Sequence, residues 1–167
     1  MRSGAQGRSR TRLCLLSKLK GLEHLRGRGS AFATGVMMLT EMTVERRAGH
    51  AVRVRAPKLA EAAVAEQYRL QPDLAERYGP DGRRCCVRDV GHHVEFLAAS
   101  IELADPGRFV SYVRWARGVM AAHGVPAGDF LVSLRALRSA AVALLPSGPA
   151  EIACRHVDAA LDAWEEA

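Results

Sequence analysis

The sequence predicts an all-α protein, an antiparallel bundle of four to five main helices preceded by a basic, mostly disordered N-terminal extension. Three observations predict this fold. Apolar residues in the second part of the chain recur at helical spacing, aromatic residues make up only 5% of the sequence, and no segment alternates with period two over the length of a strand in a sheet. We therefore expect the extension at residues 1–56 and the bundle at residues 57–167. A globin-like arrangement is one form that the bundle could take.

Charge is divided unevenly between these two parts. Residues 1–56 contain 12 Lys and Arg against 3 Asp and Glu, whereas residues 57–167 contain 12 against 15, so a net charge of +9 precedes one of −3. The N-terminal part is rich in Arg, Ser and Gly and has no sustained apolar period, which is typical of disorder. The short alternation at His50–Arg55 has no partner strand, so we expect coil there.

The basic part leaves two interpretations open. Clustered arginines are the electrostatic footprint of a nucleic-acid-binding surface, so nucleic acid could bind through residues 1–56 only. Alternatively, translation begins at Met37, Met38 or Met42, and the residues before that start have no function of their own. The expected bundle is mildly acidic and does not carry this footprint.

Helical spacing is clearest in the segment 82–104. Five apolar residues recur there at steps of three and four, which places them on one face of a helix. They are Val87, Val90, Val94, Leu97 and Ile101. We expect further helices at 58–70, 73–78, 106–123, from 126 to the turn at 146–148, and from 149 onward. The connections are short, so consecutive helices should be antiparallel neighbours.

His92 and His93 are the first candidates for chemistry. Neighbouring residues on a helix point about 100° apart, so the two rings cannot share one ligand. His93 lies beside the apolar face and could reach an axial position of a bound heme, and Tyr112 and Trp115 on the next helix could line a flat pocket. The candidate cofactor-binding residues are therefore His93, Tyr112 and Trp115. We favour the plainer interpretation, in which His93 is a partly buried histidine held by a hydrogen bond and the aromatic residues belong to the core or an interface.

Cys85 and Cys86 are candidate redox thiols. They begin the helix at 82–104, where the helix N-terminus and nearby arginines would lower a thiol pKa. The plainer interpretation is one small core thiol and one surface thiol. The chain has four cysteines, no pair of them in a C-x-x-C motif, which fits reduced thiols in a cytoplasmic protein.

No motif of a known reactive site occurs in the sequence. There is no phosphate-binding glycine loop, no H-E-x-x-H and no G-x-S-x-G, and no His or Glu stands four residues from either histidine as a zinc site would require. No apolar run approaches the length of a membrane span. The sequence therefore favours a protein that is not an enzyme, has no metal site and does not enter a membrane.

The segment from Tyr78 to Leu145 contains a spaced set of helix-cap and core residues. They are Tyr78, Gly79, Gly82, Arg83, Cys86, Asp89, His93, Phe96, Leu97, Ala104-Asp105-Pro106, Phe109, Val110, Tyr112, Val113, Trp115 and His123 to Pro126. Over roughly residues 66–166, the chain resembles the helical sensor domain of bacterial signalling proteins. Such domains often precede a cobalamin-binding module or a stressosome-type output module, and some have a globin-like arrangement without heme. The resemblance implies a helical regulatory domain, although no output module follows it here.

We therefore expect a cytoplasmic sensory or regulatory domain that acts through protein–protein contacts. The expected partners are a second copy of the chain, in a homodimer, and a separate output protein. The alternative is a sensor that binds heme, a bilin or a corrinoid. The sequence indicates no particular cofactor.

Overall fold

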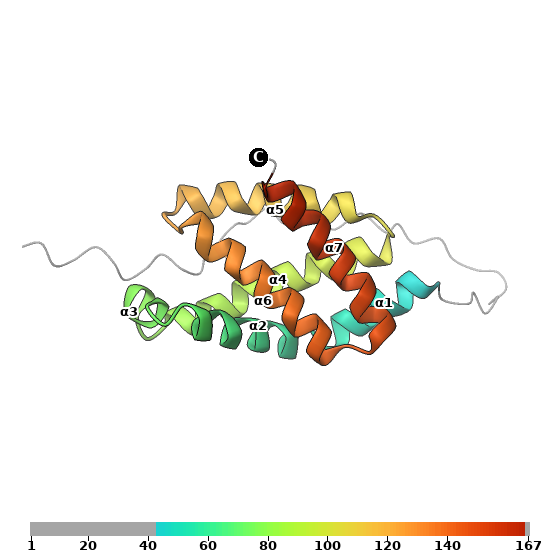
Figure 1. The fold of residues 1–167 in the computed structure, drawn as a ribbon, viewed down its shortest axis with the longest axis horizontal. Coiled ribbons are helices and arrows are strands. Elements are labelled where there is room, and N and C mark those ends of the chain that lie inside the picture. Colours follow the sequence, from blue (N-terminus) through green and yellow to red (C-terminus); the bar gives the residue numbers. More distant parts are fainter. Residues whose placement is uncertain (1–42, 166–167) are drawn as a thin grey trace, which may run out of the picture.

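The computed structural model describes residues 43–165, and every regular element in this range is a helix. The helices pack into one bundle, which confirms the predicted fold class (Figure 1). In chain order they are α1 Val44–Val54, α2 Ala56–Leu70, α3 Leu74–Tyr78, α4 Gly82–Glu102, α5 Pro106–Ala122, α6 Ala127–Leu144 and α7 Ser147–Glu165. Residues 1–42, which make up most of the expected basic extension, lie outside the described residues.

The bundle begins earlier in the chain than the sequence predicts. The coil expected at His50–Arg55 is wrong as far as Val54, because these residues continue α1. The side-chain hydroxyl of Thr43 accepts a hydrogen bond from the backbone N–H of Arg46 at 3.2 Å and so caps the helix. Ala48 and Val52, four residues apart, are buried, so the true apolar period is helical and begins before the alternation that suggested an isolated strand.

A close backbone approach holds α1 against α4. Gly49 is buried in this contact, and a Cβ at its position would lie 2.4 Å from Cγ of Glu102 and 2.9 Å from the backbone oxygen of Ala98. Beside it, the guanidinium of Arg53 binds carboxylates of α4, with Nη1 at 2.8 Å from Glu95 and Nη2 at 2.9 Å from Glu102. These ion pairs are exposed and contribute little to the free energy of folding. The lack of a side chain at Gly49 is therefore what allows α1 and α4 to pack so closely.

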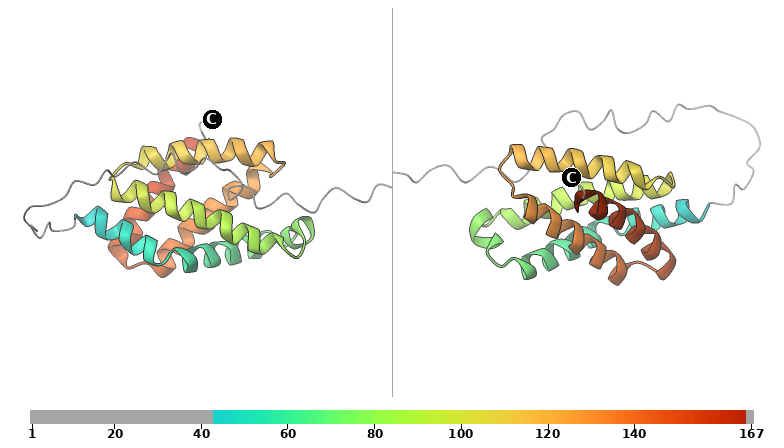
Figure 2. Two further views of the ribbon diagram at one scale, coloured as in Figure 1. Left: turned by 180° about the vertical axis from the view of Figure 1, so that it is seen from behind. Right: turned by 45° about the horizontal axis from the view of Figure 1, so that its top comes forward.

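The helices form two layers. Seen from behind, α5, α4 and the α1–α2 pair lie as three rows, and the α6–α7 hairpin crosses them on the far side (Figure 2). Between the layers, α6 contacts α2, and α7 contacts α5 and α1. The short helix α3 extends beyond the rows at one end of the bundle (Figure 1). That end is where α2, α5 and α3 finish and where α4 and α6 begin.

The core lies between the layers. The predicted apolar face of α4 is buried at Val90, Val94, Leu97 and Ile101, while Val87 at its start is only partly buried. Leu144 follows Leu137 and Ala141 at helical spacing but is 38% exposed, and the next residue, Leu145, is buried instead. The reason is that α6 ends at Leu144 and Leu145 is extended, so the helical period stops one residue earlier than the sequence suggests.

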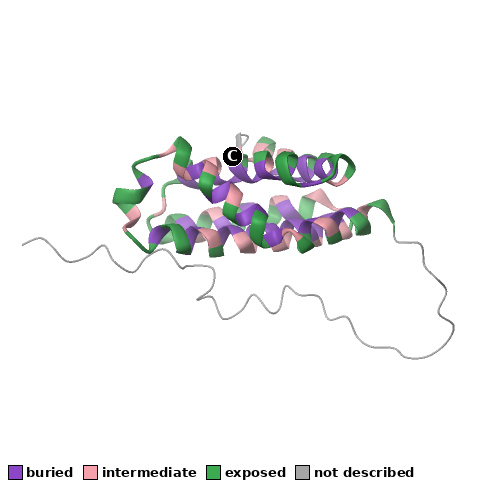
Figure 3. Ribbon diagram, turned by 90° about the horizontal axis from the view of Figure 1, so that it is seen from below, coloured by how far each residue is buried: buried purple, intermediate pink, exposed green. Residues whose placement is uncertain are grey.

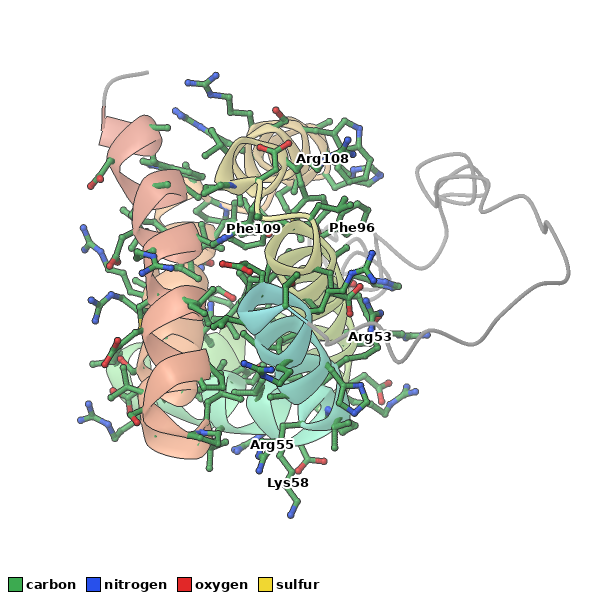
Figure 4. The ribbon with its side chains drawn as sticks, turned by 90° about the vertical axis from the view of Figure 1, so that its right-hand side faces the viewer. Arg53, Arg55, Lys58, Phe96, Arg108 and Phe109 are labelled. Carbon is green, nitrogen blue, oxygen red and sulfur yellow. The ribbon has the colours of Figure 1, made fainter. Side chains whose placement is uncertain are left out.

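Outward-facing positions are mostly polar. Buried positions face the space between the layers and exposed positions face away from it (Figure 3). Lys58, near the start of α2, points away from the bundle (Figure 4). Phe96 of α4 and Phe109 of α5 instead lie between the ribbons of these two helices. No helix within residues 43–165 is both long enough and apolar enough to cross a membrane.

Replacing Gly49 by alanine should destabilise the bundle by about 1–2 kcal/mol. The added Cβ must push the backbone of α4 away, and this overpacking outweighs the helix propensity that alanine gains over glycine. The matched control is Gly91→Ala in α4, where a Cβ would meet nothing within 4 Å, so the free energy of unfolding should rise by up to about 1 kcal/mol. Urea denaturation of both variants measures this. Equal effects of the two substitutions would contradict the close approach.

Candidate functional site

A small pocket with both polar and apolar lining residues lies at the end of the bundle where α3 is found. Its volume is about 40 Å³, enough for roughly three water molecules. The polar residues that line it are Gln67, Tyr78, Cys86, Asp89, His93, Asp129 and Ser133, and the apolar ones are Val90, Met120, Val125 and Phe130. Because they come from α2, α3, α4, α5, α6 and the loop after α5, the pocket depends on how all these segments meet.

The carboxylate of Asp129 organises this end of the bundle. Asp129 lies in the first turn of α6 and is 6% exposed. Its Oδ2 accepts hydrogen bonds from Nη1 of Arg77 at 2.7 Å and from the hydroxyl of Tyr78 at 2.5 Å. Its Oδ1 accepts hydrogen bonds from Nε2 of Gln71 at 2.9 Å and from Nη2 of Arg77 at 3.2 Å. One buried carboxylate therefore fastens α3 and the segment before it to α6.

The same contacts set the charges around Asp129. Burial by itself would raise the pKa of Asp129, but the hydrogen bonds from Arg77, Tyr78 and Gln71 outweigh it and lower that pKa. Burial and the hydrogen bond to Asp129 both raise the pKa of the Tyr78 hydroxyl. At neutral pH, Asp129 is thus an anion with a neutral phenol and a guanidinium as donors, which are the strong, charge-assisted kind of hydrogen bond.

His93 forms the inner wall of the pocket and is 2% exposed. Its Nδ1 lies 2.7 Å from the hydroxyl oxygen of Tyr112, which is itself 5% exposed. Burial lowers the pKa of His93 to about 3, so the imidazole is neutral, and burial also raises the pKa of Tyr112. Phe96 stacks on the Tyr112 ring with centroids 3.9 Å apart. His93 is therefore hydrogen-bonded, as its plainer interpretation predicts, and it is fully rather than partly buried.

The three residues predicted to hold a cofactor do not surround a common space. His93 lines the pocket, Tyr112 lies behind it and Trp115 is 39% exposed, in contact with Tyr112 at a centroid distance of 5.9 Å. A pocket of about 40 Å³ is far smaller than those that enclose drug-sized ligands, and tetrapyrroles are larger still. The residues present do not fit heme, a bilin or a corrinoid.

The two predicted redox thiols are both buried. Cys86 lines the pocket, with Sγ 4.0 Å from the hydroxyl of Tyr68, and burial raises its pKa to about 11. The expectation that the helix N-terminus and nearby arginines would lower this pKa is wrong for Cys86, because desolvation and the charges of Asp89 and Asp129 raise the pKa more than the hydrogen bond with Tyr68 lowers it. Cys85 is disulfide-bonded and is therefore not the free thiol that the sequence suggested.

One buried polar pair is absent from the sequence prediction. Ser100 in α4 lies 2.9 Å from Nδ1 of His156 in α7, and the Ser100 hydroxyl donates to the backbone oxygen of Leu97 at 2.8 Å. That proton is then unavailable to His156, so Nδ1–H of His156 is the donor of the pair. Burial lowers the pKa of His156. The pair joins two helices and does not have the polarity of an activated serine.

The centre of the site was also missed. Asp129 had no motif around it, and an acidic residue in a first helical turn is usually explained by the helix dipole. Gln67 and Ser133 carried no signal, since only the folded chain brings them to His93. No group of three or more His, Cys, Asp or Glu in the range 43–165 is arranged to hold a metal ion. The sequence matches no protein-family model and no curated protein.

Replacing Asp129 by asparagine should lower the free energy of unfolding by about 2–3 kcal/mol at pH 7, because Arg77 and Tyr78 lose a buried anionic acceptor. The pKa of Asp129 is lower in the folded chain than in the unfolded chain. Its contribution is therefore complete above the unfolded value of about 3.9 and disappears as the pH falls through the folded value. Urea denaturation at pH 7 and below pH 4 should show the difference from the parent protein shrinking in acid.

The matched control for Asp129 is Asp73, whose carboxylate also binds Arg77 at 2.7 Å but is 60% exposed. Asp73→Asn should cost less than about 1 kcal/mol. A control effect as large as that of Asp129→Asn, or an Asp129 effect that does not depend on pH, would contradict this account.

Proposed function

We propose that this chain is a non-enzymatic regulatory or sensory domain of bacterial signalling that acts through contacts with other proteins. One observation carries the proposal. The buried polar side chains of residues 43–165 that resemble reactive groups are engaged in bonds between helices, as in Asp129 with Arg77 and Ser100 with His156. Such pairs hold the bundle together, and we infer that other proteins are recognised by its outer surface.

The end of α6 is the surface that we propose for contact. Val142 is 57% exposed and Leu144 is 38% exposed, while α6 covers α2 with its other side. Exposed apolar side chains at the end of a long bundle helix suit pairing across a two-fold axis, because each copy offers the same patch to the other. The proposed partners are a second copy of this chain and a separate output protein.

Cytoplasmic location and a globin-like helix arrangement belong to this proposal as well. The cytoplasmic location is inferred from cysteine usage, and the disulfide at Cys85 removes part of that argument. We do not propose a tetrapyrrole sensor, since the pocket does not fit one. Most of the segment considered for nucleic-acid binding, residues 1–42 of 1–56, lies outside the described residues.

Sizing by light scattering tests the proposal. From about 5 to 200 μM the protein should change from monomer to dimer. Val142→Lys should keep it monomeric across that range, because burying the lysine charge in the dimer interface is costly without an opposite charge beside it. Val54→Lys is the matched control, a valine at the end of α1 that is 62% exposed, and it should leave dimerisation unchanged. A chain that stays monomeric throughout, and that also retains no protein from a bacterial lysate, would contradict the proposed function.

A further inference from the structure

We infer that the outward face of α5 binds an acidic segment of a partner protein, one in which carboxylates flank an apolar side chain. The residues that make the contact, together called the α5 face, are Arg108, Arg114, Trp115 and Arg117. Helix α5 is an outer row of the bundle and contacts α4, α6 and α7 through its buried side, so its other side is uncovered (Figure 2). The inference rests on the proposed function and deepens it, because the acidic segment would belong to the output protein.

The charge of α5 differs from that of its neighbours. The helix contains three arginines and no aspartate or glutamate, whereas each of the other helices within residues 43–165 contains at least one carboxylate. Arg108 lies 3.1 Å from Asp105 in an exposed ion pair, which is worth little. No carboxylate in the range 43–165 pairs with Arg114 or Arg117. An acidic partner can therefore bind two arginines without displacing a carboxylate of this chain.

The guanidinium of Arg117 is held in place by an aromatic ring. Its central carbon lies 4.4 Å from the centroid of the Trp164 ring, in a cation–π contact between α5 and α7. The N–H groups of a guanidinium lie in its plane and can bind both oxygens of one carboxylate. Arg114 is exposed and lies one helical turn before Arg117, so the two side chains can bind successive carboxylates of one segment.

Trp115 gives the α5 face an apolar anchor. It is 39% exposed, and its ring lies 5.9 Å from that of Tyr112, which in turn stacks on Phe96 at 3.9 Å. The indole therefore rests against other aromatic rings and offers its free side to a partner. A Cβ at Gly118, on the next turn, would meet nothing within 4 Å, so the backbone is accessible there as well. Tryptophan and arginine are the residues that most often dominate the energy of protein–protein interfaces.

Two other occupants fit the α5 face less well. A second copy related by a two-fold axis through α5 would bring the same arginines together, and like charges repel. Nucleic acid would extend beyond α5 over the rest of the bundle, and residues 57–167 contain 15 Asp and Glu against 12 Lys and Arg. Surfaces that bind nucleic acid are basic over a wide area and stack several bases, whereas this face has one exposed tryptophan. A short acidic segment matches the charge of α5 alone.

The test is an NMR titration of the full-length protein with a synthetic peptide of about 12 residues, in which glutamate and leucine recur at helical spacing. Residues 1–42 are rich in arginine and attract the same peptide, so the signal must be local to α5. The chain has two tryptophans, and Trp115→Phe identifies the indole N–H signal of Trp115. We expect this signal to shift saturably, with a dissociation constant of about 10–100 μM at about 50 mM NaCl and about tenfold weaker binding at about 500 mM.

Charge reversal locates the binding. Arg114→Glu should weaken peptide binding at least about tenfold, because an ion pair is replaced by repulsion. Lys58→Glu is the matched control, since it makes the same change in net charge at an exposed side chain that points away from the bundle (Figure 4). It should change the affinity by less than about twofold. Equal weakening in the two variants would overturn the inference, because net charge alone would then account for the binding.

Two further results would also overturn it. One is the absence of a saturable shift of the Trp115 signal, and the other is equally tight binding of an oligothymidylate of about the same length, which would assign the α5 face to nucleic acid. The titrations are independent of sizing, since Arg114→Glu should leave dimerisation unchanged. A dimer that does not bind the peptide contradicts the α5 face alone. A chain that binds the peptide, stays monomeric and retains no protein from a lysate contradicts the proposed function alone.

Discussion

The structure depends most on one buried anion, the carboxylate of Asp129. It accepts four side-chain hydrogen bonds, from Gln71, Arg77 and Tyr78, and its backbone oxygen accepts a fifth from Gln67. All of these donors come from α2, α3 or the turn between them. A helix of five residues has no stability of its own, so α3 keeps its place because Leu74 is buried and because this carboxylate holds its last turn.

The apolar interior is divided into two clusters. The main core extends through α1, α2, α4, α5, α6 and α7, whereas Met120 packs with Val119 and Val125 in a separate small cluster. The pocket lies between them, because its lining includes Val90 and Phe130 of the main core and Met120 and Val125 of the small cluster. Polar residues, among them Asp129 and His93, also line it at this boundary.

Sequence patterns predicted the parts of the fold that local physics determines. The face of α4, the Asp105–Pro106 start of α5 and the glycine end of α3, where Gly79 has φ 68°, all follow from periodicity and capping. Helix α1 was missed because the buried Gly49 has no apolar signature. His93 was expected to be partly buried and hydrogen-bonded, whereas it is 2% exposed. The residues that share its pocket were not identified, since Gln67 and Ser133 are far from it in sequence. Asp129 could not be recognised because its donors lie more than 50 residues away.

The most direct test of the central claim is a carbon-13 NMR titration of the Asp129 side-chain carboxyl. If Asp129 is an anion held by Arg77, Tyr78 and Gln71, its pKa lies below the usual value of about 3.9, and α3 loses its contacts only in acid. A pKa at or above that usual value would show that burial prevails over the hydrogen bonds. The carboxylate would then not be what fastens α3 to α6.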